Sequence, residues 1–456
     1  MFEPELLSLN FRISPGPHRR LLYLLLFVGA GCATAPRPNP QPAPVQSTPE
    51  RVPGPPPHPV TAAPQPAGPT AELLGSVSFA ATGDIMAHGE VKKAATAADG
   101  GWDALYAPIA PVIGPADIAF GNLETPVAPD HDHGSRPFIF NAPPEMLAAL
   151  KRAGFDVVLF ANNHAYDQDR DGFAESLDRI DASGLKEVGA GRTRDAAQAP
   201  LRMEVNGVKL AWFGAAQFFN DLGPGHQRNV DDPKQPFANL LDGQAMAAAI
   251  AKVRPEVDAV IVSVHWGVEY MEAPRQSEID LAHQFFEAGA DVIIGSHPHV
   301  LQPIEVYRAK DGRTCLCLYS LGNFISNQNR QYLPHAQPDK NGDSRDGAIV
   351  QFTLEKRRYG PQLTALNLAG VRYVPLWTDN NFYRPKDQAV DIHPVVIDVA
   401  LKQAHDELDA AEKAAGPKPS KEAAAHIISL KQRIDLLELR RKRIVARLGE
   451  DFSGDP

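Results

Sequence analysis

Short, nearly continuous apolar runs alternate with amphipathic segments over most of this sequence, and this alternation restricts the fold more than any other feature. Runs such as DVVLF, DAVIVSV and DVIIG are rich in β-branched residues and are followed by Asn, His or Gly. This pattern is typical of buried strands with functional loops at their carboxyl ends. Between the runs, residues 143–154, 170–184 and 275–290 show apolar positions at helical spacing and end at or next to a glycine. Strand and helix therefore alternate, which predicts an α/β domain.

Composition agrees with a folded body and argues against one class of partner. Of the 456 residues, 43% are hydrophobic and 22% are charged, as in globular proteins. The formal net charge is -10, so the chain as a whole is acidic. Because nucleic acid phosphates require a clustered basic surface, we expect no nucleic acid partner. The strand and helix pattern places the α/β body at residues 76–378.

The first 32 residues have the layout of a signal peptide. Arg12, Arg19 and Arg20 precede the apolar run LLYLLLFVGA, which ends in small residues before Cys32. The run is shorter than the roughly twenty residues that a membrane-spanning helix needs. The residues before Cys32 resemble a bacterial lipobox, although such motifs usually carry Leu where Gly29 stands.

We therefore expect the chain to be exported to the cell envelope as a lipoprotein. Lipidated Cys32 would anchor it to a membrane, on the periplasmic or outer surface. Simple cleavage of the signal peptide and an uncleaved anchor are the alternatives.

Two further segments flank the predicted body. Residues 33–70 are dense in proline and poor in large apolar side chains, which predicts a disordered, extended linker. Residues 394–450 carry two helix-rich pieces separated by GPKPS, with Leu and Ile at helical spacing in the second. This pattern predicts an antiparallel helical hairpin that packs on the body or mediates dimerisation.

Polar side chains of metal-ligand or acid and base type follow nearly every predicted strand. The carboxyl ends of parallel strands meet at one edge of a sheet, so these side chains can converge although they are far apart in sequence. Carboxylate, imidazole and amide groups together suit zinc, manganese or iron. The set comprises Asp84, Asn122, Glu124, Asn163, His164, His265, His297, His299 and Asn323.

Each of these residues also has a structural explanation. Asp84 is a possible helix cap, Asn122 a turn cap and Glu124 a solvated loop charge, while His265 is a possible hydrogen-bonded core residue. Asp167 either orients the His164 imidazole or caps the next helix. The coincidence of so many such residues at successive strand ends is what favours a metal site.

In this order, the motifs resemble the CapA family, a branch of the calcineurin-like metallophosphatase superfamily linked to poly-γ-glutamate synthesis. The resemblance covers about residues 76–377. It is carried by the segments GDIMAHG, GNLE, ANNHAYD, HWGVEY, GADVIIGSHPHVLQPIE and SLGNF. Each segment is weakly specific alone, whereas the ordered series is strongly specific.

The resemblance implies a metallophosphatase-like α/β/β/α sandwich, with one or two divalent ions at the strand ends. Asp84, Asn163 and His265 correspond to metal ligands. His164 corresponds to the acid or to the residue that stabilises the transition state. The final pair, His297 and His299, also corresponds to ligands, and we expect Asp167 and Asn323 to lie behind the ligands as orienting groups.

Two departures from the superfamily pattern affect the expected metal number. Met86 stands where superfamily phosphoesterases carry a histidine, and His88 is a possible substitute. After Gly121, the expected bridging aspartate is replaced by Asn122, with Glu124 nearby. These changes allow either a two-metal centre or a reduced, one-metal site.

The expected function is poly-γ-glutamate or related capsule biosynthesis by metal-assisted hydrolysis or transfer at an amide or ester bond. His164 would handle the proton of the leaving group, and Glu124 would be a ligand or a general base. The expected partner is an anionic polymer such as poly-γ-glutamate, or its synthase complex. The alternatives are a periplasmic metallophosphoesterase and a non-enzymatic accessory lipoprotein that binds the polymer or the synthase through its helical tail.

Overall fold

The structure is a computed structural model that describes residues 71–133, 138–220 and 232–452. The predicted signal peptide, the lipobox-like Cys32 and the proline-rich linker lie outside the described residues. Within the described ranges, no helix combines the length and the apolar character that crossing a membrane requires.

The first sheet contains eight strands and provides half of the candidate site. Its parallel part runs from β1 to β4, and β14, β15 and β16 extend it in antiparallel fashion on the other side of β1. The short strand β13 pairs with the end of β1 in parallel. The strands are β16 (Ile392–Val396), β15 (Thr364–Asn380), β14 (Asp346–Arg358), β1 (Glu72–Ile85), β2 (Ile118–Leu123), β3 (Val157–Leu159), β4 (Lys186–Val188) and β13 (Asn323–Ile325).

The second sheet contains six strands and provides the other half of the site. Four central strands are parallel, and the two edge strands, β6 and β11, are antiparallel to their neighbours. In order they are β11 (Ile304–Arg308), β12 (Thr314–Leu318), β10 (Val292–Ser296), β9 (Ala259–His265), β7 (Val208–Ala216) and β6 (Leu201–Val205). A separate two-stranded sheet pairs β5 (Ala190–Gly191) with β8 (Phe237–Ala238).

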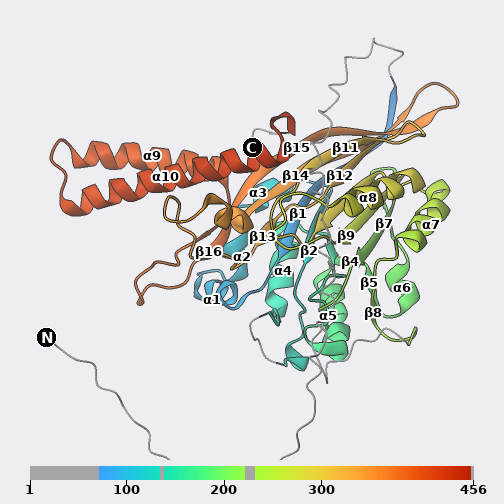
Figure 1. The fold of residues 1–456 in the computed structure, drawn as a ribbon, viewed down its shortest axis with the longest axis horizontal. Helices are drawn as coiled ribbons and strands as arrows, with labels where there is room; N and C mark the ends of the chain where they lie inside the picture. Colours follow the sequence, from blue (N-terminus) through green and yellow to red (C-terminus); the bar gives the residue numbers. More distant parts are fainter. Residues whose placement is uncertain (1–70, 134–137, 221–231, 453–456) are drawn as a thin grey trace, which may run out of the picture. The chain divides into compact units, whose positions relative to one another are not determined.

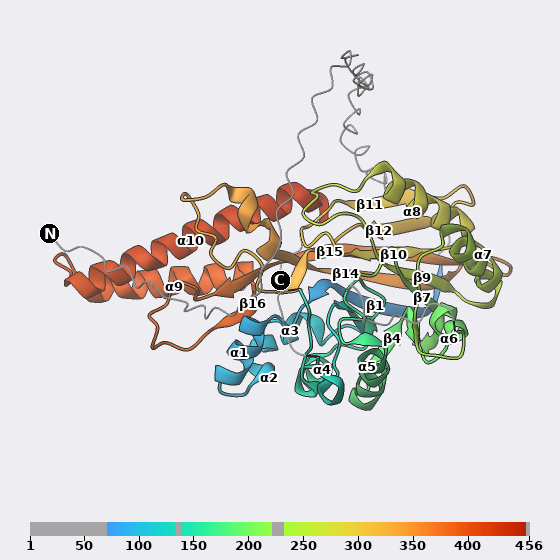
Figure 2. The same ribbon diagram turned by 60° about the horizontal axis from the view of Figure 1, so that its bottom comes forward.

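Helices cover the outer faces of the two sheets, as Figures 1 and 2 show. The first five helices pack on the first sheet, with 3-10 turn η1 against α5, and α7 and α8 pack on the second sheet. The helices of the first group are α1 (Gly89–Ala97), α2 (Trp102–Tyr106), α3 (Ala110–Ile113), α4 (Pro144–Ala153), α5 (Asp169–Ser183) and η1 (Pro129–His131). The others are α6 (Arg194–Gln198), beside β5, then α7 (Gly243–Val253), η2 (Arg254–Glu256) and α8 (Gln276–Ala288).

Successive side chains of β7 point to opposite faces of the second sheet, and a separate hydrophobic core lies on each face. Leu210 and Trp212 point to the first sheet, whereas Ala211 and Phe213 join the core under α7 and α8. Trp212 is fully buried and its ring lies 5.3 Å from that of Phe120 across the two sheets. The layers therefore run helix, sheet, sheet, helix, which confirms the predicted α/β/β/α sandwich.

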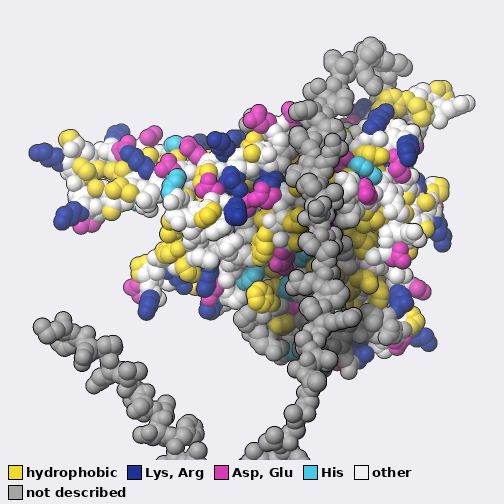
Figure 3. All heavy atoms as spheres, in the orientation of Figure 1, with side chains coloured by type: hydrophobic (Ala, Val, Ile, Leu, Met, Phe, Trp, Pro, Cys, Tyr) yellow, Lys and Arg dark blue, Asp and Glu magenta, His cyan; other side chains and the backbone are white. Residues whose placement is uncertain are grey.

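The chain ends in two long helices, α9 (Ile397–Ala415) and α10 (Lys421–Leu448), followed by η4 (Glu450–Phe452). They pack side by side and extend beyond the sheets at one end, as Figures 1 and 2 show. In Figure 3 the visible face of this hairpin carries side chains of both charges together with hydrophobic ones. The helical hairpin predicted from the sequence is therefore present.

The first sheet continues past both predicted limits of the body, 76 and 378. Strand β1 begins at Glu72, and β16 adds a further strand at the far edge. The five residues of β16, IHPVV, are too short a run to be identified as a strand without their partner β15.

Candidate metal centre

Three polar residues of the first sheet are direct neighbours across parallel strands. Asp84, near the end of β1, is paired in register with Asn122 of β2 on one side and with Asn323 of β13 on the other. All three side chains are buried. The sequence predicts that polar side chains converge at the strand ends, and here the pairing register of the strands brings three of them together.

Asn122 joins the two carboxylates of the site. Its amide nitrogen donates to Asp84 Oδ1 at 2.8 Å and to Glu124 Oε2 at 3.1 Å. Asp84 lies within strand β1, and the N-cap of helix α1 is His88, so the helix-cap interpretation of Asp84 is wrong. Glu124 is 0% exposed, so the solvated-charge interpretation is wrong as well.

The second sheet contributes His265, the last residue of β9. Its Nε2 lies 3.0 Å from Asn163 Oδ1, in the loop after β3. Its Nδ1 lies 3.2 Å from Oγ of Ser296, the residue of β10 that is paired with His265 of β9. The two sheets therefore meet at this imidazole.

The turn after β10 presents two more histidines. His297 and His299 have φ angles of 100° and 57°, in the left-handed region that is costly for residues other than glycine. His299 Nδ1 lies 2.9 Å from Asp84 Oδ2 and 3.1 Å from Asn323 Oδ1. This contact directs the other ring nitrogen, Nε2, toward Glu124, whose Oε1 is 3.7 Å away. A strained turn that keeps two imidazoles facing buried carboxylates is typical of a functional site.

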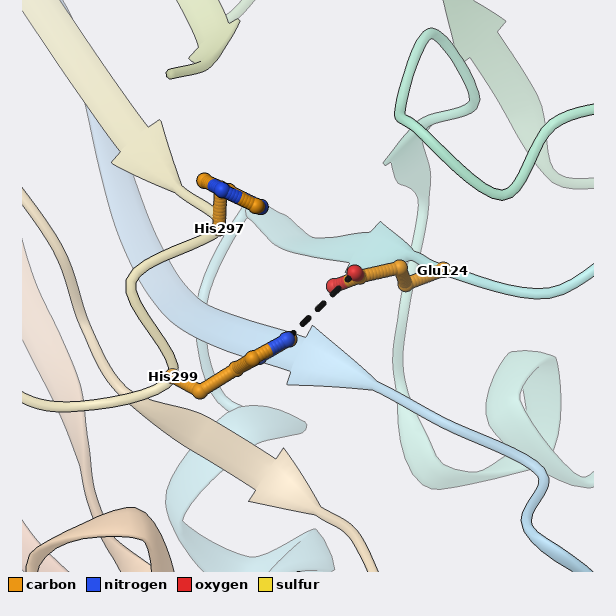
Figure 4. Close-up of side chains that lie close together, drawn as sticks. All are labelled: Glu124, His297 and His299. Atoms are coloured by element: carbon orange, nitrogen blue, oxygen red, sulfur yellow. Dashed lines mark ion pairs between the residues drawn. The ribbon is translucent and has the colours of Figure 1, made fainter. Parts of the chain in front are cut away.

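The donors form two overlapping groups that fit divalent cations. One group is Glu124, His297 and His299, and the other is Asp84, Glu124 and His265; in each, the ligand atoms lie within 4.8 Å of one another. Figure 4 shows the His299 ring directed at the Glu124 carboxylate, with His297 close by. Glu124 Oε1 and His297 Nδ1 are buried and have no hydrogen-bond partner. A cation would satisfy both atoms, so the residues present fit a metal.

The electrostatics of the site agree with this fit. Burial raises the pKa of Glu124 well above its usual value, and the negative charges of Asp84 and Glu269 raise it further. Burial lowers the pKa of His265 well below its usual value and that of His297 to about 3. The imidazoles of His265 and His297 are therefore neutral near pH 7, which is the form that binds metals.

His164 lies beside these groups and is held by Asp167. Its Nδ1 is 2.8 Å from Asp167 Oδ2, and its ring centroid is 4.4 Å from that of Phe140. Helix α5 begins after an N-cap at Gln168, so the Asp167 carboxylate orients the imidazole instead of capping the helix. His164 belongs to neither ligand group, which leaves its ring available for proton transfer.

The position of the superfamily histidine is apolar here. Met86 is buried, and its Sδ lies 4.0 Å from Gln328 Nε2. His88 is half-buried, and desolvation together with the charges of His299 and His164 lowers its pKa to about 3. Its Nδ1 accepts a hydrogen bond from the backbone of Asn327, and His88 belongs to neither ligand group.

Several residues near the site are absent from the predicted set. Asn220 Nδ2 lies 3.4 Å from His164 Nδ1, and the rings of Phe218 and Tyr270 lie 5.0 Å from His297 and 6.1 Å from His299. Asn220 comes four residues after β7, the one central strand whose end has no candidate ligand. A search of that loop for polar residues would have found it.

Residues 78–328, more than half of the chain, match the family described as "Bacterial capsule synthesis protein PGA_cap". The chain belongs to this family. The matched range contains every predicted metal ligand, together with His164, Asp167 and Asn323, so the PGA_cap region and the candidate centre coincide.

Relatives of this PGA_cap protein are found in several bacteria. The PGA biosynthesis protein CapA of Bacillus subtilis (strain 168) is 31% identical over 310 residues, covering 67% of this chain and 74% of the relative. The capsule biosynthesis protein CapA of Bacillus anthracis is 30% identical over 280 residues, covering 60% and 62%. A probable polyglutamine synthesis accessory protein of Mycobacterium tuberculosis is 27% identical over 216 residues, covering 46% and 55%. The match spans less than two thirds of the latter two.

Among solved structures, a hypothetical protein from Thermus thermophilus aligns with a TM-score of 0.35 and 17% identity, over 65% of this chain and 99% of that chain.

Replacing Glu124 with Gln tests the role of the shared carboxylate. The variant keeps the shape of the side chain, and we expect it to lose metal while its metal-free form becomes more stable at pH 7 by about 1–2 kcal/mol, because a buried acid with repelling neighbours is removed. The raised pKa sets the sign of the pH dependence: the stability gain is present above the usual pKa of 4.5 and disappears below it, where Glu124 is protonated in the folded and unfolded states alike.

Chemical unfolding of the chelator-treated proteins at pH 7 and pH 4, together with elemental analysis, measures both effects. Glu204→Gln, at an exposed position of β6, is the control and is expected to change neither. Retention of stoichiometric metal by Glu124→Gln would contradict the assignment.

Proposed function

We propose that this protein serves the biosynthesis of poly-γ-glutamate or a related capsule polymer, as a metal-dependent hydrolase or transferase acting on an amide or ester bond. The family membership and the names of the two Bacillus relatives support a role in the biosynthesis of this polymer. The observation that carries the chemistry is the buried carboxylate Glu124, which is shared by two groups of metal-ligating side chains.

The five side chains of the two ligand groups would hold one or two ions of zinc, manganese or iron. Imidazole and carboxylate donors in this proportion suit these borderline cations. When bound, such an ion polarises a carbonyl or phosphoryl oxygen and makes water acidic enough to act as a nucleophile at neutral pH. The ligands are Asp84, Glu124, His265, His297 and His299, with the Asn163 amide beside them.

His164 is the proposed proton donor to the leaving group. Asp167 accepts a hydrogen bond from Nδ1 and orients the ring, so that Nε2 is the atom that would give a proton to the leaving group. Phe140 packs on the ring at 4.4 Å between centroids and fixes its plane. Bond cleavage requires an acid next to the leaving group, and we propose that His164, held by the Asp167 carboxylate, supplies it.

His164→Ala is expected to lower kcat on a γ-glutamyl oligomer about 10²- to 10⁴-fold, because the leaving group then departs without a general acid. The metal content of the variant should equal that of the unaltered protein, since His164 is not in either ligand group. Amine release from the oligomer and elemental analysis are the two measurements. His131→Ala is the matched control, because His131 forms a similar pair with Glu175 at 2.9 Å outside the site.

The same assay separates the rival functions. Turnover of an aryl phosphate without turnover of the γ-glutamyl oligomer would contradict the proposal and identify a metallophosphoesterase. Metal binding and polymer binding without turnover of either substrate would also contradict it and identify a non-enzymatic accessory.

We further propose that the protein acts in the cell envelope, tethered to a membrane by a lipid on Cys32. The support is the sequence pattern before Cys32 and the proline-rich segment after it. Such a tether would hold the metal centre near a membrane-bound synthase complex or its anionic polymer product.

Cys32→Ser is expected to move the protein from the membrane fraction to the soluble exported fraction and to abolish incorporation of labelled fatty acid. Cys317→Ser is the control, because Cys317 is buried in β12 and cannot be lipidated in the folded protein. Fatty acid incorporation that persists in Cys32→Ser would contradict the anchor.

A further inference from the structure

The C-terminal half of α10 binds the α/β body through arginine–aspartate pairs that are buried or half-buried. Arg440 is fully buried and donates from Nε to Asp346 Oδ1 at 2.8 Å and from Nη2 to Asp343 Oδ1 at 2.6 Å. One turn later, Arg443 binds both oxygens of Asp343, at 2.8 Å and 2.6 Å. Two arginines of one helix therefore fix the two ends of the short segment from Asp343 to Asp346.

This clamped segment lies directly behind Asn323, a residue predicted to orient a ligand of the metal centre. It joins 3-10 helix η3 (Asp339–Arg345) to β14, and the Ser344 carbonyl accepts a hydrogen bond from Asn323 Nδ2 at 2.7 Å. The other end of the same amide, Asn323 Oδ1, lies 3.1 Å from His299 Nδ1. Three contacts thus connect α10 to a metal-ligating imidazole.

The backbone in this region leaves little freedom for the segment to move independently. A Cβ on Gly322 would approach the Asp346 carbonyl oxygen to 2.5 Å, and a Cβ on Gly347 would approach the Asn323 carbonyl oxygen to 2.2 Å. The two chain segments are therefore packed backbone to backbone. A displacement of Asp346 would be transmitted to Asn323.

A second contact of α10 reaches the same histidine from the other side. Arg447 donates to the Glu272 carbonyl at 2.8 Å and to its carboxylate at 2.5 Å. The loop that contains Glu272 also contains Tyr270, whose backbone N–H donates to the Pro298 carbonyl at 2.8 Å. Pro298 is the central residue of the turn that carries His297 and His299.

We propose that α10 is a positioning element of the metal centre, in which the Arg443–Asp343 pair and the buried Arg440 set the place of His299 through Asn323. The inference rests on the proposed metal centre. Groups behind metal ligands orient them, and their loss weakens metal binding without removing a ligand. Burying an ion pair costs desolvation free energy, so apolar contacts would be enough to attach a helix whose role is only structural. Charged hydrogen bonds are directional, so the arginines of α10 also fix the position of the residues that they contact.

Arg443→Gln tests this role, with Arg433→Gln as the matched control. Both arginines lie on α10 and pair with one aspartate, but Arg433 pairs with Asp379, at 2.5 Å, outside the route to His299. We expect Arg443→Gln to weaken zinc binding about tenfold and to alter the absorption spectrum of the cobalt-substituted protein. Arg433→Gln should stay within about twofold of the unaltered protein, because its half-buried pair with Asp379 makes no contact on the route to His299.

Zinc affinity is measured by chelator competition on the full chain, and thermal unfolding of the metal-free variants shows that both remain folded. Arg443→Lys, which keeps the charge, should restore part of the affinity. Arg447→Gln is a second variant on the independent route through Glu272 and serves if Arg443→Gln does not fold.

The outcomes distinguish the inference from the proposed function. If the unaltered protein binds no metal, the metal centre and the inference are both overturned. If the unaltered protein binds zinc and the folded Arg443→Gln variant, or Arg447→Gln in its place, binds it equally well, only the positioning role of α10 is overturned.

Discussion

Two carboxylates, Asp84 and Glu124, are buried side by side where the two sheets meet, and the rest of the site is arranged around their charge. A buried carboxylate is costly unless it is paired or coordinates a cation. Here the amide of Asn122 donates to both, and His299 approaches both. These contacts compensate only part of the charge, and Glu124 Oε1 is left without a hydrogen bond. The site is therefore built at the expense of stability, which is a common property of functional centres.

The positions of the ligands could be predicted from the sequence because parallel strands place their carboxyl ends together. Asp84 and His299 are 215 residues apart, yet each directly follows or ends an apolar run that identifies a strand. The pairing of His164 with Asp167 could be anticipated because Asp167 follows His164 by three positions. Which donor contacts which acceptor could not, because the register between strands and the left-handed turn at His297 are set by tertiary packing. Asn220 was missed because it lies in a loop beyond the strand end.

The C-terminal hairpin shows a different limit of sequence reasoning. Apolar residues at helical spacing reveal that α10 has a buried face, but they do not identify what that face contacts. The buried face includes Arg440, a residue type that usually indicates a solvated surface. Because α10 also supports His299, deleting the hairpin would disturb the metal centre together with any surface that binds the polymer or the synthase. Such a deletion cannot distinguish an accessory protein from an enzyme, whereas the assays of substrate turnover can.

The central claim is that the buried histidines and carboxylates hold a metal, and elemental mass spectrometry of the purified protein tests it most directly. The comparison is between the unaltered protein, a His297→Ala, His299→Ala double variant, and a His283→Ala, His393→Ala control whose histidines pair with Glu305 and Asp391 outside the site. The account predicts near-stoichiometric metal in the unaltered protein and in the control, and its loss in the double variant. Absence of metal from all three after incubation with zinc and manganese, or equal metal in all three, would contradict it.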